Sequence, residues 1–430
     1  MKRRLAFMQA VAAVVRDELG RDITTSADSA VWSLADSSVA TISGTSLTGA
    51  ATTGYTTLTA TAGVRSAQVL LLVGTPFVGM AAGRAHTCGL TPEGQAYCWG
   101  DNDYGQLGDS TVTDRLTPTA VRQGATRYVQ ITARGNHTCA LTAAGQAFCW
   151  GKGAYGQLGY GASGVNRNVP VAVAQGSSSF GRITAGEEHT CGLTDAGRAW
   201  CWGWNGDGQL GDNTFTSRPA PVAVLQGIPT YLEIAAGGYH TCARAAGGHA
   251  WCWGNGQNGR LGTVGYGDRV TPGEVRQGAF RYVDIAIGMA HGCGLSDDGQ
   301  TRCWGWNGYG QIGDGTSVSP DKTVAVHQGA ATYASIISGD YHTCGRSAAG
   351  QTYCWGSNLA GQLGTGGSSN VIALPAAVQQ GSTTYAEVVA GPVHTCGRVA
   401  TGQAYCWGSN VGGQLGDGTR VNRVTPVPVL

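Results

Sequence analysis

The sequence predicts an all-β protein whose larger part is a β-propeller made of four-stranded repeats. The prediction depends on one phrase, His-Thr-Cys followed on the next strand by Cys-Trp-Gly, which occurs in seven copies. The first cysteines of successive copies lie 51 or 52 residues apart. A period of about 50 residues, with four strand-sized segments in each, is typical of propeller blades.

Each copy begins with a predicted first strand, in which an aromatic residue is followed three positions later by an aliphatic residue or methionine. These pairs are Phe77/Met80, Tyr128/Ile131, Phe180/Ile183, Tyr231/Ile234, Tyr282/Ile285, Tyr333/Ile336 and Tyr385/Val388. The second and third strands carry the cysteines and are joined by a glycine-containing turn, which indicates a β-hairpin. A Gly-Gln-Leu-Gly turn, such as Gly105 to Gly108, ends the third strand.

The fourth strand of each copy is marked by proline. Proline lacks the N–H that a paired strand needs, so it is tolerated at an outer edge. The residues are Pro118, Pro170, Pro219, Pro272, Pro320, Pro375 and Pro426. The sequence leaves open how the ring closes: Val424 to Leu430 either complete the last blade alone or share a blade with residues near Phe77.

All fourteen cysteines belong to these hairpins. Cys88 and Cys98 are symmetric about Glu93 and therefore face each other on neighbouring strands, where opposed Cβ atoms lie about 4.5–5.5 Å apart. A small inward movement reaches disulfide geometry, and closing so short a loop contributes about 2 to 3 kcal/mol. We predict seven disulfides, which favour an oxidising compartment: Cys88–Cys98, Cys139–Cys149, Cys191–Cys201, Cys242–Cys252, Cys293–Cys303, Cys344–Cys354 and Cys396–Cys406.

Two other interpretations of the cysteines stay open. Seven zinc sites would have suitable ligand types, but only three ligands each and no Cys-x-x-Cys knuckle. Fourteen reduced cysteines would act as small buried hydrophobic residues. We predict no metal site and no cofactor.

The seven repeated histidines have a predicted structural role. A catalytic constellation needs one asymmetric arrangement, whereas a residue supplied once per blade is expected to bond to backbone in its own blade. The seven Trp residues of Cys-Trp-Gly are expected to pack within the blades. We therefore predict no catalytic residue and no enzyme activity. The histidines are His86, His137, His189, His240, His291, His342 and His394.

Composition excludes several functional classes. Lys+Arg number 27 against Asp+Glu 26, so the net charge of +1 gives no general attraction for nucleic acid. No apolar run is long enough to span a bilayer. Met1 to Val15 has basic residues before an apolar segment, so it is either a signal peptide or the first strand of an N-terminal domain.

From Phe77 to the end, the copies resemble the regulator of chromosome condensation repeat, with Gly-x-x-His-Thr, Trp-Gly and Asn-x-x-Gly-Gln-Leu-Gly in order. The resemblance implies a seven-bladed β-propeller over residues 75–430, and the paired cysteines resemble the bacterial, exported branch of the family. This chain departs from the motif at four positions, namely Arg134 for glycine, Gly292 for threonine, Arg260 for glutamine and Ile312 for leucine.

Residues 1–74 lack the repeat and resemble a bacterial immunoglobulin-like domain of the invasin type. The resemblance rests on the Gly20 to Thr24, Ala30 to Ser33 and Ser38 to Ile42 segments. Strands are expected at Val31 to Leu34, Ser38 to Ile42, Thr56 to Ala62 and Ala67 to Val73, as a small β-sandwich spacer; a sandwich unrelated to that family is the alternative.

If the repeats build the scaffold, binding is expected where the repeats differ. Successive antiparallel strands reverse direction, so the first-to-second and third-to-fourth connections share one end of the propeller. Non-repeated aromatic and acidic residues in them are typical of recognition surfaces, although packing between blades would also account for them. The predicted binding residues are Tyr104, Tyr155, Glu187, Glu188, Trp204, Asp207, Tyr239, Trp306, Tyr309 and Tyr341.

The sequence thus predicts an exported or cell-surface binding protein that recognises a protein or a surface carbohydrate. It predicts neither nucleic-acid binding nor a transmembrane segment, and leaves the oligomeric state open. One alternative is a nucleotide-exchange regulator of a small GTPase. Family members with that activity use a wedge inserted into a blade, for which the even spacing leaves no room. Others are a secreted inhibitor of an enzyme and a purely structural surface protein.

Overall fold

The computed structural model describes residues 8–9, 31–34, 40–43, 46–49, 54–62, 65–73, 75–225, 227, 230–320 and 322–430. The chain divides into two compact units, Met1–Thr75 together with Leu430, and Pro76–Val429. In the described part of the chain, no helix is both long and apolar enough to cross a membrane.

The described residues of the first unit form two antiparallel three-stranded sheets. One has the order β1 (Met8–Gln9), β4 (Ser46–Gly49), β3 (Ala40–Ser43), and the other β2 (Val31–Leu34), β5 (Gly54–Ala62), β6 (Arg65–Val73). The four expected strands overlap β2, β3, β5 and β6, whereas β4 was not expected. The Gly20 to Thr24 motif, and Leu5 to Val15 apart from β1, lie outside the described residues.

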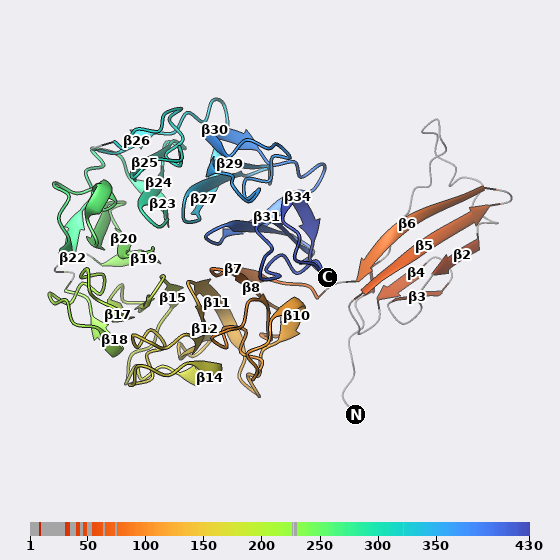
Figure 1. Ribbon diagram of the computed structural model, residues 1–430, viewed down its shortest axis with the longest axis horizontal. Coiled ribbons are helices and arrows are strands. Elements are labelled where there is room, and N and C mark those ends of the chain that lie inside the picture. Colours follow the sequence, from red (N-terminus) through yellow and green to blue (C-terminus); the bar gives the residue numbers. More distant parts are fainter. Residues whose placement is uncertain are drawn as a thin grey trace. The chain divides into compact units, whose positions relative to one another are not determined.

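The second unit consists of seven four-stranded antiparallel sheets, each made from four consecutive strands (Figure 1). This confirms the predicted seven-bladed propeller. Blade 1 comprises β7 (Gly79–Ala82), β8 (His86–Leu90), β9 (Ala96–Gly100) and β10 (Arg115–Ala120). Blade 2 comprises β11 (Tyr128–Arg134), β12 (His137–Thr142), β13 (Ala147–Gly151) and β14 (Arg167–Ala172), and blade 3 comprises β15 (Arg182–Ala185), β16 (His189–Leu193), β17 (Ala199–Gly203) and β18 (Arg218–Ala223).

The remaining blades follow the same order. Blade 4 comprises β19 (Tyr231–Ala236), β20 (His240–Ala245), β21 (Ala250–Gly254) and β22 (Arg269–Glu274), with a short 3-10 turn η2 (Gln257–Gly259). Blade 5 comprises β23 (Tyr282–Ile287), β24 (His291–Ser296), β25 (Thr301–Gly305) and β26 (Val324–Ala325). Blade 6 comprises β27 (Tyr333–Ser338), β28 (His342–Ser347), β29 (Thr352–Ser357) and β30 (Val371–Ala377), and blade 7 comprises β31 (Tyr385–Ala390), β32 (His394–Val399), β33 (Ala404–Gly408) and β34 (Arg423–Pro428).

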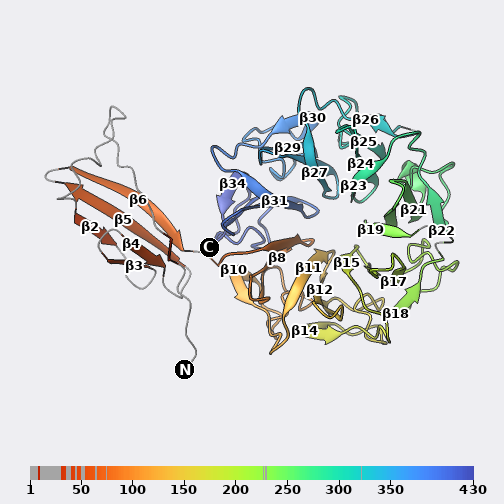
Figure 2. The ribbon, with the colours of Figure 1, turned by 180° about the vertical axis from the view of Figure 1, so that it is seen from behind.

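The first strand of each blade lies toward the centre of the ring and the fourth toward the outside (Figures 1 and 2). Six of the seven marker prolines lie in fourth strands. Pro320 is the exception, because β26 begins only at Val324 and the proline lies in the preceding loop.

The ring closes between blade 7 and blade 1 without a shared strand, since β34 completes blade 7 by pairing with β33. The backbone N–H of Phe77 donates to the carbonyl of Gly402 at 2.9 Å. Phe77 and Trp99 of blade 1 also pack against Cys396, Cys406 and Leu415 of blade 7. Closure therefore depends on the same kind of core that fills every other seam, where a seam is the interface between two neighbouring blades.

The predicted disulfides are all present. In each blade the two cysteines are directly opposed in the register of the second and third strands, as Cys139 is opposite Cys149, and their S–S distances are 2.05–2.09 Å. All fourteen cysteines are bonded in this way. The pairing is thus disulfide, not zinc ligation or free thiol.

The repeated histidines join neighbouring blades, which corrects the prediction that they bond to backbone in their own blade. His137 Nε2 lies 2.9 Å from Thr190 Oγ1 of the next blade, and Thr190 Oγ1 donates to the carbonyl of Gln157 at 2.9 Å. Because the threonine hydroxyl donates its proton to that carbonyl, it accepts from the imidazole. The same link joins His86 to Thr138, His189 to Thr241, His291 to Thr343, His342 to Thr395 and His394 to Thr87.

The seam between blades 4 and 5 lacks this link. Gly292 occupies the threonine position, and among the described residues neither ring nitrogen of His240 has a hydrogen-bond partner. Full burial lowers the pKa of the other six imidazoles to about 3, and that of His240 well below its usual value. All seven are therefore neutral structural groups at physiological pH.

Candidate functional site: the loop face

Both predicted sets of connections meet at one end of the propeller, which we call the loop face. It consists of the loops between first and second strands and between third and fourth strands of every blade. Hydrogen bonds join the two sets directly: the backbone N–H of Trp204 donates to the carbonyl of Glu188, and that of Trp306 to the carbonyl of Ala290, both at 2.9 Å. The two sets of loops therefore share one end, as the alternating strand directions predict.

An asparagine holds each of the longer loops that carry tryptophan. Asn205 Oδ1 accepts from the backbone N–H of Leu210 at 2.9 Å, while its Nδ2 donates to the carbonyls of Thr214 and Thr216. Asn307 makes the equivalent bonds in blade 5. These asparagines follow Trp204 and Trp306 directly in the sequence. Both tryptophans therefore lie on loops that are held by their own hydrogen bonds.

The predicted aromatic residues form two clusters. In the first cluster, Trp204 lies 6.3 Å from Tyr155 and 5.6 Å from Tyr239, measured between ring centroids. These three residues come from blades 2, 3 and 4. Tyr155 is 44% exposed, and Trp204 and Tyr239 are half-buried.

The second cluster contains Trp306, Tyr309 and Tyr341. Its three centroid distances are 5.3–5.5 Å, and all three side chains are half-buried. Tyr104 contacts neither cluster through its ring, but Lys152 Nζ lies 5.7 Å from the Tyr104 centroid and 5.6 Å from that of Tyr155. Packing between blades and partial exposure therefore occur together in these residues.

The predicted acidic residues do not form one exposed group. Glu188 Oε1 accepts from Lys152 at 2.6 Å, and its Oε2 accepts from Gln157 at 2.7 Å. Asp207 accepts from Asn255 at 3.1 Å. Glu187 is only 5% exposed and lies 3.6 Å from Arg84 of blade 1, so we assign it to the buried floor of the loop face and not to its exposed rim.

An ion pair across the ring was not predicted. Arg134 Nη2 lies 3.0 Å from Asp340 Oδ1, and Arg134 Nη1 donates to the carbonyl of Ile287 at 3.0 Å. Both side chains are buried, and the contacts join blade 2 to blades 5 and 6. The replacement of the usual glycine by Arg134 was the only sign of this ion pair in the sequence. Its partners are identified by the geometry of the ring.

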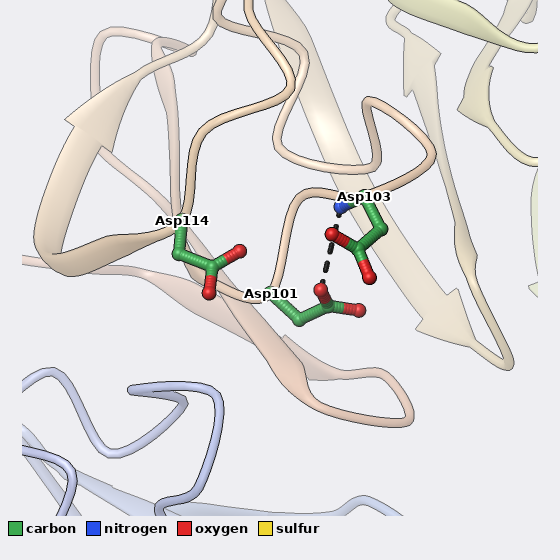
Figure 3. A group of neighbouring side chains, drawn as sticks. All are labelled: Asp101, Asp103 and Asp114. Carbon is green, nitrogen blue, oxygen red and sulfur yellow. Dashed lines mark hydrogen bonds between the residues drawn. The ribbon is translucent and has the colours of Figure 1, made fainter.

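One group of carboxylates on the loop face has the spacing of cation ligands. Oxygens of Asp101, Asp103 and Asp114 lie within 4.8 Å of one another (Figure 3). Asp101 already accepts from the Asp103 backbone and from Gln106, and Asp114 pairs with Arg420 at 2.8 Å. Since protein donors already bond to the carboxylates of Asp101 and Asp114, we assign no metal to this group.

Comparison with known proteins decides the family of the chain. The model of the RCC1-like domain matches residues 46–332, and models of the regulator of chromosome condensation (RCC1) repeat match residues 385–414 and 401–430. The chain belongs to the RCC1 repeat family. This confirms the resemblance of the propeller repeats to the regulator of chromosome condensation repeat.

Two curated RCC1-type relatives have very different sizes. The chain is 30% identical to the ultraviolet-B receptor UVR8 of Arabidopsis thaliana over 357 residues, which is 81% of this chain and 80% of the receptor. It is 33% identical to human E3 ubiquitin-protein ligase HERC2 over 341 residues, which is 76% of this chain but 7% of the ligase. These relatives include a receptor and a ligase, so the family alone does not assign an activity.

Two solved structures share the fold. Yeast RCC1 (Prp20) in its complex with Kap60 superposes with a TM-score of 0.69 and 20% identity, covering 78% of this chain and 83% of that one. Human WBSCR16 superposes with a TM-score of 0.70 and 18% identity, covering 78% and 94%. At these identities the likeness establishes the propeller fold alone.

Proposed function

We propose that this RCC1-type chain is an exported, non-enzymatic interaction protein whose loop face binds a protein partner. The observation that carries the proposal is the pair of half-exposed aromatic clusters on internally bonded loops. Tryptophan and tyrosine held rigidly with one face accessible are the side chains that contribute most at protein interfaces. The loops that present them are also the places where the seven copies differ.

Export is supported by the seven disulfides, because disulfides persist in oxidising compartments and are rare in reducing ones. The paired cysteines also resemble the exported bacterial branch of the family. We further propose that residues 1–74 form an immunoglobulin-like spacer, which the two three-stranded antiparallel sheets support.

Replacing Trp204, Trp306 and Tyr341 together by alanine tests the proposal. A partner is first captured with the full chain, purified, and then titrated against wild type and the triple variant. We expect affinity to fall at least about 100-fold, since each interface anchor contributes about 2 kcal/mol or more. A matched control, Val129→Ser with Val283→Ser, changes exposed residues near the opposite end of the first strands and should leave affinity unchanged.

Equal affinity of the triple variant and wild type would exclude the loop face as the binding surface. Capture of a carbohydrate instead of a protein would contradict the partner class. A nucleotide-exchange role predicts that the purified chain accelerates nucleotide release from a small GTPase, whereas our proposal predicts no acceleration. Prp20p of Saccharomyces cerevisiae has binding properties to Gsp1p and histones, but the likeness of this chain to Prp20p concerns the fold only.

A further inference from the structure

The floor of the loop face holds a buried carboxylate whose hydrogen-bonding capacity is incompletely used. Glu187 is 5% exposed, and in the described part of the protein its Oε2 atom has no hydrogen-bond partner. Its Oε1 atom lies 3.6 Å from Arg84 Nε, beyond ordinary hydrogen-bond length. A buried carboxylate without donors carries a large desolvation cost, so this oxygen is suited to accept from a donor brought by another molecule.

The cation paired with this carboxylate, Arg84, is itself reached by solvent. The Arg84 side chain is 55% exposed, whereas two acids near Glu187, namely Glu188 and Asp340, have closer cationic partners. Glu188 is held by Lys152 at 2.6 Å and Asp340 by Arg134 at 3.0 Å. Of these three acidic groups, only Glu187 has a weakly held counter-ion that can be displaced.

The backbone of Glu187 is bonded to the loop that carries one of the aromatic residues. The Glu187 backbone N–H donates to the carbonyl of Gly237, two residues before Tyr239, and Tyr239 packs edge-on against Trp204. Burial raises the pKa of the Tyr239 phenol, and the negative charges of Glu187 and Glu188 raise it further while Arg84 opposes them. Three acids, Glu187, Glu188 and Asp340, and one cation, Arg84, therefore act on the Tyr239 phenol.

A guanidinium group matches these features better than other side chains. It can donate two parallel hydrogen bonds to one carboxylate and stack on an aromatic ring at the same time. Arg84 in its present position makes no hydrogen bond to Glu187 within ordinary length. An incoming guanidinium with free choice of approach can make both contacts, so displacement of Arg84 is favourable.

We propose that Glu187 and Tyr239 form a seat for an arginine side chain of the protein partner, which binds by displacing Arg84. This inference rests on the proposed function and names the chemistry that the loop face recognises. The partner contributes a guanidinium to Glu187 and a hydrophobic surface to the two aromatic clusters.

The test uses the full chain and two capped tripeptides, Gly-Arg-Gly and the same peptide with citrulline, whose neutral side chain has nearly the shape of arginine. Binding is followed by tryptophan fluorescence, since Trp204 adjoins the seat. We expect the arginine peptide to bind at least tenfold more tightly than the citrulline peptide. Glu187→Gln should weaken binding of the arginine peptide at least tenfold. Arg84→Ala should strengthen it several-fold, because the side chain that competes for Glu187 is removed.

The gain with Arg84→Ala separates a binding role of Glu187 from a structural one, and it does not depend on the stability of the Glu187 variant. Glu93→Gln is the matched control, because Glu93 is an exposed acid in the turn at the opposite end of blade 1, and it should bind like wild type. Equal binding of the two peptides, or unchanged arginine binding by Glu187→Gln, would overturn the seat. If Glu187→Gln keeps full affinity for the captured partner while the triple aromatic variant loses it, the seat fails and the loop face stands.

Discussion

The seam between blades 4 and 5 differs from the other six in the bond that joins neighbouring blades. Six seams have a buried His-to-Thr hydrogen bond, with distances of 2.8–3.0 Å. At the remaining seam Gly292 replaces threonine and His240 has no partner among the described residues. The hydrophobic core is present there too, since Trp304 packs with Cys242, Cys252 and Leu261. A propeller seam can therefore form around its apolar core without the polar link.

The same seam also contains an unusual pair of acids. Glu233 of β19 interacts with Asp284 of β23 and pairs with Arg244 at 2.9 Å. Burial and the neighbouring Asp284 raise the pKa of Glu233 to about 7. Asp284 in turn accepts from the backbone N–H of Ile336 in blade 6 at 2.9 Å.

The largest expected difference between seams comes from removing a histidine. His137→Ala deletes a buried ring and leaves Thr190 without its donor, so we expect a loss of about 3 kcal/mol in the free energy of unfolding. His240→Ala deletes the same ring but breaks no hydrogen bond, so its cost should be smaller by about 1 kcal/mol. Denaturant midpoints measured without reducing agent check this, and equal costs would show that the polar link contributes nothing.

Removing a disulfide should not distinguish the blades. Replacing Cys139 and Cys149 by alanine, or Cys242 and Cys252, opens the same short loop and is expected to cost about 2 to 3 kcal/mol in either blade. Thermal unfolding of the two double variants provides the measurement. A much larger cost in blade 4 would mean that the weakness belongs to the blade and not to its seam with blade 5.

The free energy of unfolding should decrease at acid pH because of the buried histidines, and a substitution should remove the contribution of one of them. The pKa of folded His137 is lowered from 6.5 to about 3, so below pH 6.5 the unfolded chain takes up a proton that the folded chain does not. Stability is therefore present above pH 6.5 and is lost as the pH falls. Between pH 6.5 and 5.5 this histidine accounts for a loss of about 1 kcal/mol, which His137→Gln should abolish. Parallel curves for the variant and wild type would contradict the assignment.

The smallest expected effect is at Glu233. Its folded pKa is raised above 4.5 to about 7, so its contribution is present at low pH and is lost as the pH rises toward 7. Glu233→Gln removes this dependence and should stabilise the chain at pH 8 by about 1 kcal/mol, with little change at pH 5. Glu387→Gln is the control, because Glu387 occupies the same position in blade 7 and pairs with Arg398 at 3.0 Å.

Local sequence patterns were sufficient to predict the hairpin and the disulfide within each copy. The spacing of Cys88, Glu93 and Cys98 predicted the hairpin and hence the disulfide. The alternating strand directions predicted that the loops with Trp204 and Trp306 lie at the same end of the propeller as the loops between first and second strands. Contacts between copies were beyond this reasoning. The threonine that accepts from His137 belongs to the next blade, so no spacing inside one copy indicates it.

Contacts across the ring are still less accessible from sequence. Arg134 contacts Asp340 only because the ring of seven blades brings the loops between first and second strands together around one axis. For the same reason Glu187, which in sequence looks like its neighbour Glu188, is buried at the centre. The spacing of the repeats in the sequence does not indicate which residues of distant blades come into contact when the ring closes.

Hydrogen exchange of the full chain, free and bound to its captured partner, tests most directly whether the loop face is the binding surface. We predict slower amide exchange on binding at the loops that contain Arg84, Glu187, Trp204 and Trp306, with no change at the turns that contain Glu93, Asp195 and Asp298. Protection confined to those opposite turns would show that the partner does not bind the loop face.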